Sequence, residues 1–270
     1  MEVIEQEELS IGRACKIMNM SRSMFYYQSI KDDSEVEAKL QDLAEKKPTR
    51  GLDHYYGLIR NEGILWNHKR VGRVYKKLGL NIRRKRKRRV PRREKEALVI
   101  PEQMNQSWSI DFMHDSLESG RKVKFLNILD DFNREALAID IASSITGERL
   151  KSVLEQIIDW RGKPVEIRTD NGPEFLSAPF VQFCESNQIR IKYIQPGKPV
   201  QNALIERFNR TFREDVLNAY IFEDMNQVRE IAEQWMEEYN ENHPHQSLGG
   251  ISPRKYLSMH KKFTQFQTVR

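Results

Sequence analysis

The sequence predicts an α/β protein: a mixed sheet with helices on its faces, preceded by small all-α modules. Three apolar, strand-like runs follow one another closely after residue 100, and then come a helix, a strand, a second helix and a fifth strand. Short connections between consecutive strands favour antiparallel pairing, whereas the later alternation of helices and strands indicates helices packed on a sheet. The segment before residue 100 shows helical periodicity instead, which predicts helical modules in front of the sheet.

Each element of the predicted sheet is placed by its periodicity. Alternating or continuous apolar runs of this length indicate strands, and apolar positions three and four residues apart indicate helices. Gly162 follows one strong amphipathic run and is expected to end that helix. The expected strands are 108–113, 124–132, 135–142, 165–170 and 190–194, and the expected helices are 147–162, 178–187, 201–218 and 226–240.

The first 80 residues read as helices. Residues 10–28 predict two short helices, the second capped by Ser21, which fit a helix-turn-helix or an ordinary α-hairpin equally well. Residues 35–80 predict a second helical module. Its last helix is expected to begin after Asn67 as N-cap and to end at Gly79.

Positive charge is concentrated in one stretch. The chain has a net charge of +6, but residues 81–95 hold ten Lys and Arg against one Glu, so the rest of the chain is net negative. Such a run attracts polyanions without regard to sequence, and nucleic acid is favoured over a solubility tail or an anionic membrane surface. One face of the helix predicted at 67–80 is also basic and leads directly into the run, which favours contact with a DNA backbone.

Several classes of protein are not supported. Cys15 and Cys184 are far apart, so they form neither a disulfide framework nor a C-x-x-C zinc site. The six histidines contain no H-E-x-x-H pattern. No secretory segment or apolar run near 18 residues occurs, so we expect an intracellular protein without a membrane span.

Two acidic residues occupy places where strands could present them together. Asp170 ends a strand-like run, and Asn171-Gly172 after it favours a tight turn. The alternative role for Asp170 is to cap the next helix. Asp111 lies within the first strand, on the same face as Ser109, and its alternative is an exposed position on an edge strand.

A third acid comes from the helix predicted at 201–218. Its apolar stripe contains Ile205 and Phe208, and Glu206 lies on a polar stripe, where its alternative is plain solvation. Three converging carboxylates would suit Mg²⁺, a hard cation that prefers oxygen ligands, and two such ions can clamp a phosphate. Asp130 and Asp131 are the rivals of Asp111 as the first ligand.

The motifs together resemble a known family. "WSIDFM", "RTDNGPEF", "GKPVQNALIERFNRTFREDVLN" and "YNENHPHQSLGGISPRKYL" are similar to the integrase-type core of bacterial insertion-sequence transposases, above all the second-reading-frame product of the insertion-sequence-three family. The resemblance covers about 100–257 strongly and 35–95 more weakly. The spacing of 35 residues between Asp170 and Glu206 is also that of the family. The resemblance, not geometry, selects Asp111 over its rivals.

This resemblance implies a ribonuclease H-like five-stranded fold and a DDE transposase. It implies DNA end cleavage and strand transfer that depend on two Mg²⁺ ions, with Mn²⁺ as a substitute, and with Asp111, Asp170 and Glu206 as catalytic metal ligands. The implied partners are DNA at element ends and target, further copies of the chain, and an upstream-frame DNA-binding protein or fusion. The implied location is the bacterial cytoplasm, at the nucleoid.

Two alternatives remain: a ribonuclease H-like nuclease without strand transfer, and a non-catalytic DNA-binding protein on a transposase scaffold.

The same reasoning assigns secondary roles and boundaries. Glu174 is interpreted as a helix-start or supporting acid, and His243 stands where the family more often carries arginine. The expected domains are a helix-turn-helix-like segment at 1–30, a DNA-binding module at 31–82, a basic linker at 83–103, the catalytic core at 104–262 and a tail at 263–270. The predicted DNA contacts are Lys69, Arg70, Arg73, Arg83, Arg84, Lys85, Arg86, Lys87, Arg88, Arg89, Lys198, Asn202, Asn209, Arg210 and Arg213.

Overall fold

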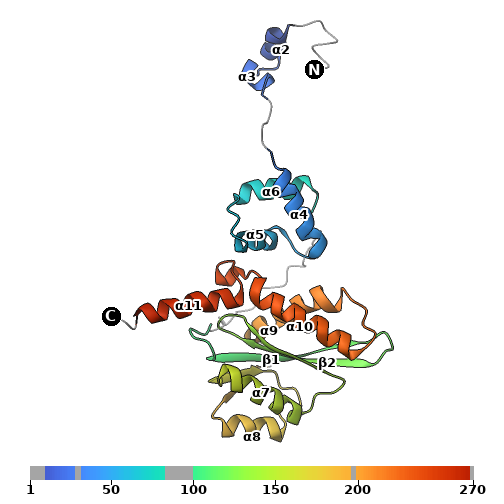
Figure 1. The fold of residues 1–270 in the computed structure, drawn as a ribbon, viewed down its shortest axis with the longest axis vertical. Coiled ribbons are helices and arrows are strands. Elements are labelled where there is room, and N and C mark those ends of the chain that lie inside the picture. Colours follow the sequence, from blue (N-terminus) through green and yellow to red (C-terminus); the bar gives the residue numbers. More distant parts are fainter. Residues whose placement is uncertain (1–9, 28–31, 83–99, 196–198, 268–270) are drawn as a thin grey trace.

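The structure, a computed structural model, describes residues 10–27, 32–82, 100–195 and 199–267 of the 270-residue chain. A sheet with helices on both faces forms the core, and smaller helical modules precede it along the chain (Figure 1). Within the described ranges, no helix has the length and apolar character needed to cross a membrane.

The core is built on a mixed five-stranded sheet with the order β3-β2-β1-β4-β5. The first three strands pair antiparallel, and β4 runs parallel to both β1 and β5. This arrangement confirms the expected ribonuclease H-like fold. The strands are β1 Ser107–Ser116, β2 Lys122–Asp130, β3 Ala136–Ala142, β4 Glu166–Thr169 and β5 Arg190–Tyr193.

Helices cover the two faces of this sheet in separate groups. Helices α7 and α8 lie on one side of the sheet, and α9 and α10 lie on the other (Figure 1). Helix α9 continues into a π-helical segment, η2, where the sequence predicts one regular helix. The bounds are α7 Gly147–Arg161, α8 Ala178–Ser186, η1 Pro199–Asn202, α9 Ala203–Phe212, η2 Arg213–Leu217, α10 Met225–Asn242, η3 Gln246–Leu248 and α11 Pro253–Gln267.

The alternation of β1 places its side chains in two different cores. Trp108 and Ile110 are fully buried among the residues of α7 and α8. Met113 points to the opposite face of β1 and packs in the cluster that contains residues of η2 and α10. Because successive side chains of a strand point to opposite faces, the odd-numbered polar residues of β1, Ser109 and Asp111, face α9 and α10.

The helical modules in front of the core form as expected. Ser21 accepts a hydrogen bond from Met24 N and caps the short second helix, and Asn67 caps the last helix of the larger module by accepting from Lys69 N. Gly79 has a φ of +68°, which suits a residue that ends a helix. The helices are α2 Ile11–Ile17, α3 Arg22–Phe25, α4 Ser34–Lys46, α5 Leu52–Asn61 and α6 His68–Lys77. The proposed domain boundaries stay predictions.

The larger helical module packs directly on the core. Helix α5 approaches the segment after α10 so closely that a Cβ added at Gly57 would lie 2.6 Å from Cβ of Pro244. The His54 and His243 rings face each other with centroids 4.8 Å apart. Arg50, at the edge of the module, forms an ion pair of 2.6 Å with Asp215 of η2. We call this contact region the joint.

Candidate active site

The three predicted ligands belong to adjoining elements of the core. Asp111 lies within β1, and Asp170 follows β4, the parallel neighbour of β1. Glu206 projects from α9, which packs against β1 and β2. Burial is the main cause that raises the pKa of Asp111; the negative charges of Asp170 and Glu206 act in the same direction, hydrogen bonds from Phe112 N and Asn209 oppose it, and the resulting pKa is about 6. Asp111 therefore lies close enough to Asp170 and to Glu206 for their charges to act on it.

The chemistry of these groups fits a hard divalent cation. All three donors are carboxylates, and Asp170 and Glu206 are exposed, whereas Asp111 is half-buried. A cation would relieve the repulsion between them, as bound ions do in other sites. In the described parts of the chain, no three His, Cys, Asp or Glu are gathered tightly enough to hold a metal. Among these residues, the three carboxylates therefore do not form a ready-made coordination shell.

A local turn fixes Asp170. Its Oδ1 accepts a hydrogen bond of 2.9 Å from Gly172 N, and Asn171 donates a hydrogen bond of 3.2 Å to the carbonyl of Ile194 beyond β5. Helix α8 begins later, after Ser177. The alternative in which Asp170 caps the next helix is therefore wrong. The turn itself lies at 173–176, directly after the predicted Asn171-Gly172, and neither of these two residues has a positive φ.

Two asparagines hold Asp111 from the side of α9. Asn209 donates to Asp111 Oδ2 over 2.8 Å, and Asn127 donates to Asn209 Oδ1 over 2.7 Å. The other carboxylate oxygen of Asp111 accepts from Phe112 N at 2.8 Å. Sequence reasoning missed Asn127, although an amide within the apolar run "FLNIL" of a buried strand is an unusual residue that could have been noticed.

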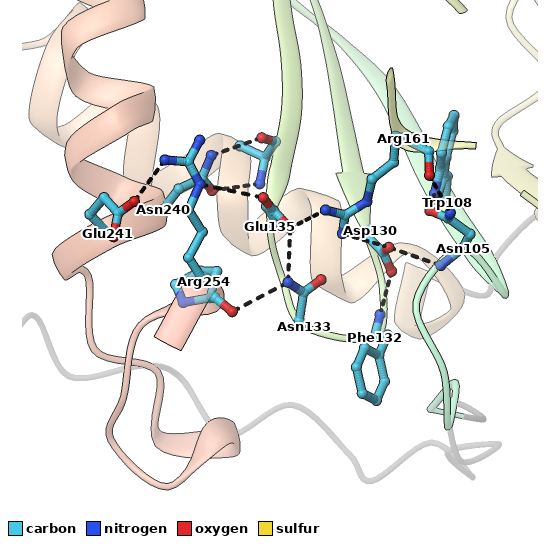
Figure 2. A network of polar contacts seen from close by, with 12 residues as sticks. Asn105, Trp108, Asp130, Phe132, Asn133, Glu135, Arg161, Asn240, Glu241 and Arg254 are labelled. Atoms are coloured by element: carbon cyan, nitrogen blue, oxygen red, sulfur yellow. Dashed lines mark hydrogen bonds and ion pairs between the residues drawn. The ribbon is translucent and has the colours of Figure 1, made fainter. Parts of the chain in front are cut away.

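Asp130, the first of the two rivals for the first ligand, has a structural role. It is fully buried, and it accepts from Asn105 N and Phe132 N, each at 3.0 Å. It also pairs with Arg161, which reaches Glu135 on its other side (Figure 2). These contacts occupy the carboxylate with protein donors, so Asp130 has no free face for a metal.

Asp131 is likewise fully buried and satisfied by protein groups. Its oxygens accept from Ser107 at 2.8 Å and from Ser109 at 2.6 Å, and Arg168 lies 3.2 Å away. The two serines share the face of β1 that also presents Asp111. The polar face of β1 therefore has two parts. Near the start of the strand, Ser107 and Ser109 donate hydrogen bonds to the buried Asp131, and farther along the strand the same face carries Asp111.

Glu174 pairs with a residue on the opposite face of the sheet from Asp111. Its partner is Lys124 of β2, whose ammonium lies 4.0 Å from the centre of the Phe112 ring. Phe112 stacks in turn on Phe175. The interpretation of Glu174 as a supporting acid stays a prediction, and the helix it was expected to start begins at Ala178.

The predicted DNA contacts lie in varied surroundings. In α6, Asp33 pairs with Arg70 at 3.0 Å and with Arg73 at 2.7 Å, so both cations are partly neutralised, while Lys69 is exposed. Near the carboxylates, Asn202 and Asn209 are buried and Arg210 is exposed; Arg213 donates to the carbonyl of His114. The remaining predicted contacts lie outside the described residues: Arg83, Arg84, Lys85, Arg86, Lys87, Arg88, Arg89 and Lys198.

The chain is similar to several known proteins. Two models described as integrase core domains match residues 101–199 and 187–253. A Burkholderia multivorans protein, the insertion element IS407 uncharacterized 31.7 kDa protein, is 39% identical over 95% of this chain and 94% of its own length. The Escherichia coli transposase InsD of insertion element IS2 is 28% identical over 84% and 79% of the two chains. Among solved structures, the HTLV-2 integrase catalytic core domain in complex with magnesium has a TM-score of 0.44 and 22% identity, covering 59% of this chain and 99% of that one.

Proposed function

We propose that this chain, which belongs to the family of insertion-element proteins with an integrase core domain, is a DDE transposase that cuts and joins DNA. The observation that carries the proposal is the placement of Asp111 on β1, Asp170 directly after the neighbouring parallel strand β4, and Glu206 on α9, which packs against β1. The resemblance of the motifs to the insertion-sequence-three family and the likeness to an insertion-element transposase of Escherichia coli support it.

In the proposed reaction, Asp111, Asp170 and Glu206 are the residues that would hold two Mg²⁺ ions at the scissile phosphate. Such ions, when bound, activate the attacking oxygen and stabilise the leaving one. The protein positions the ligands: the turn at Gly172 orients Asp170, and Asn209 orients Asp111. Water first attacks the phosphodiester at the end of the element and frees a 3′-hydroxyl. That hydroxyl then attacks a target phosphodiester and displaces a second 3′-oxygen, without a covalent bond to the protein.

The proposed partners follow from this reaction. Two element ends must be brought to one target, so we propose that several copies of the chain assemble on DNA. An upstream-frame protein or fusion would supply further end recognition. A bacterial, nucleoid-associated location is part of the same proposal, and it agrees with relatives encoded by bacterial insertion elements.

An oligonucleotide assay tests the proposed function. The full chain is incubated with Mg²⁺, a labelled duplex carrying the element's end, and an unlabelled target duplex. We expect labelled strands covalently joined to the target. Hydrolysis without joining would indicate a nuclease instead, and binding without either reaction would indicate a DNA-binding protein on a transposase scaffold.

Neutralising the basic run should weaken binding to all DNA sequences alike. Replacing Arg83, Arg84, Arg86 and Arg88 by Gln removes four cations, so the slope of log affinity against log salt should become shallower by about 0.9 for each phosphate that the chain no longer neutralises. Fluorescence anisotropy at several salt concentrations measures this. The matched control is Arg73→Gln, which should change the slope less because Asp33 already pairs with Arg73. Weaker binding confined to one DNA sequence would show that the run reads bases.

A further inference from the structure

Asn127 occupies an unusual place for an amide. It lies in the middle strand pair of the sheet, directly opposite Asp111 in the ladder, and its side chain is fully buried. Its neighbours Leu126 and Ile128 point to the other face and pack with α7. On its own face, Asn127 meets Asn209 of α9, and the two amides form a short relay that ends at Asp111.

The relay fixes which end of the Asn209 amide faces the carboxylate. An amide has a donor end and an acceptor end of nearly equal size, so only its hydrogen bonds decide its orientation. Asn127 donates to Asn209 Oδ1, which turns the NH₂ group of Asn209 toward Asp111 Oδ2. With the opposite orientation, Asn209 would present its oxygen to a negatively charged oxygen, which is unfavourable.

Stability alone does not explain Asn127. Its own Oδ1 is buried and has no hydrogen-bond partner among the residues that the structure describes. An unsatisfied buried acceptor loses its hydration without compensation, and an apolar residue of similar size would avoid that cost. Asn240, another buried amide that bridges elements, is satisfied at both ends, since it donates to the carbonyl of Ala136 and accepts from its N–H. Asn133 and Asn202 also leave a buried Oδ1 unpaired among the described residues, so the inference rests on the hydrogen bond that Asn127 donates to Asn209.

We propose that Asn127 is a positioning residue, which acts through Asn209 to hold Asp111 in the orientation that metal binding requires. This inference rests on the proposed function, because it takes Asp111 to be a metal ligand. Asp111 is held from two directions, by Phe112 N on one oxygen and by Asn209 on the other. Partners that orient ligands in this way typically affect metal affinity by about 10–100-fold when they are removed.

The test measures the affinity of the full chain for Mn²⁺ by calorimetry, without DNA. We expect Asn127→Leu to weaken Mn²⁺ binding by at least about tenfold. Asn209→Leu should weaken it similarly, and Asn127→Leu should add no further effect in the Asn209→Leu background. Additive effects would overturn the relay, and so would unchanged affinity in Asn127→Leu. The matched control is Asn240→Leu, which should lower the melting temperature but keep the Mn²⁺ affinity.

Two further measurements keep the outcomes distinct. Wild-type Mn²⁺ binding that is not weakened by Asp170→Asn would contradict the proposed function, whereas weakening in Asp170→Asn with full affinity in Asn127→Leu would contradict the relay alone. If Asn127→Leu does not fold, NMR of the wild-type chain decides. The side-chain NH₂ of Asn209 should exchange slowly with solvent, and fast exchange would overturn the relay.

Discussion

Asp170→Asn and Glu206→Gln will each abolish Mg²⁺-dependent cleavage of an element end while DNA binding is retained. Each change keeps the shape of the side chain but removes its negative charge, and a neutral amide is a poor substitute for a carboxylate as a ligand of Mg²⁺. Metal ions contribute several kcal/mol to the stabilisation of such transition states, so the rate should fall by about a thousandfold or more. Cleavage of a labelled end duplex and its gel-shift affinity are measured side by side.

The control for this prediction is Glu174→Gln. Glu174 lies close to the site but pairs with Lys124, so its replacement should leave most of the cleavage rate. Cleavage that persists in both Asp170→Asn and Glu206→Gln would refute their assignment as metal ligands. A parallel loss of DNA binding in both variants would point to a folding defect or a direct DNA contact, and melting temperatures separate these two results.

The helices and strands could be predicted from the sequence because each type of element has its own hydrophobic periodicity. The alternation of β1 correctly separated Ile110 from Ser109 and Asp111, and the stripe of α9 correctly placed Ile205 and Phe208 in the core. The convergence of the three carboxylates stays a prediction, made partly because parallel strands end at the same edge and mainly from the resemblance of the motifs.

Periodicity could not supply the contacts between distant segments. It grouped Asn209 with Glu206 on one polar stripe, but it could not show that the Asn209 end of this stripe packs against β2. That result depends on strand register, which brings Asn127 opposite Asp111 and is set by the assembled sheet. In the same way, the basic face of α6 was evident, but the pairing of Arg70 and Arg73 with Asp33 was not, because Asp33 belongs to a distant part of the sequence.

The histidines of the joint went unrecognised for the same reason. His54 comes from α5, and His243 and His245 follow α10, so only the folded chain brings them together. The His243 ring lies 4.9 Å from that of His245 and stacks on Tyr239 at 5.0 Å. The sequence assigned His243 no role, whereas the structure gives it a packing role at the contact between the helical module and the core.

These three imidazoles are held neutral in the folded protein. Burial lowers the pKa of His54 to about 3, helped by the positive charges of Arg50 and Lys47. Burial also lowers the pKa of His245 to about 3, with Arg134 and Arg207 acting in the same direction, and it lowers that of His243. Three carboxylates of the joint, those of Asp215, Glu214 and Glu238, are paired with Arg50 and Lys47.

Acidification should therefore destabilise the folded chain through the joint. In the unfolded chain, histidine binds a proton below a pKa of about 6.5, whereas in the folded chain these rings stay neutral until much lower pH. The contribution of the neutral rings to the free energy of unfolding is thus fully present above about pH 6.5. It falls as the pH decreases toward 3, by up to ~1.4 kcal/mol per pH unit for each ring. At pH 5.5 the three rings together would lower the free energy of unfolding by up to about 4 kcal/mol, since each ring binds a proton only after unfolding.

Urea unfolding of the full chain at pH 7.5 and pH 5.5 measures this effect. Wild-type protein should lose several kcal/mol of unfolding free energy between the two values, whereas a variant with Gln in place of His54, His243 and His245 should lose much less. The matched control is His114→Gln, because His114 is exposed on β1 and should leave the pH dependence of the wild type intact. Equal pH dependence in the triple variant and the wild type would show that carboxylates elsewhere, and not the joint, govern the acid sensitivity. A smaller dependence in the triple variant would instead place the acid-sensitive contact between α5 and the segment after α10, where Gly57 already leaves no room beside Pro244.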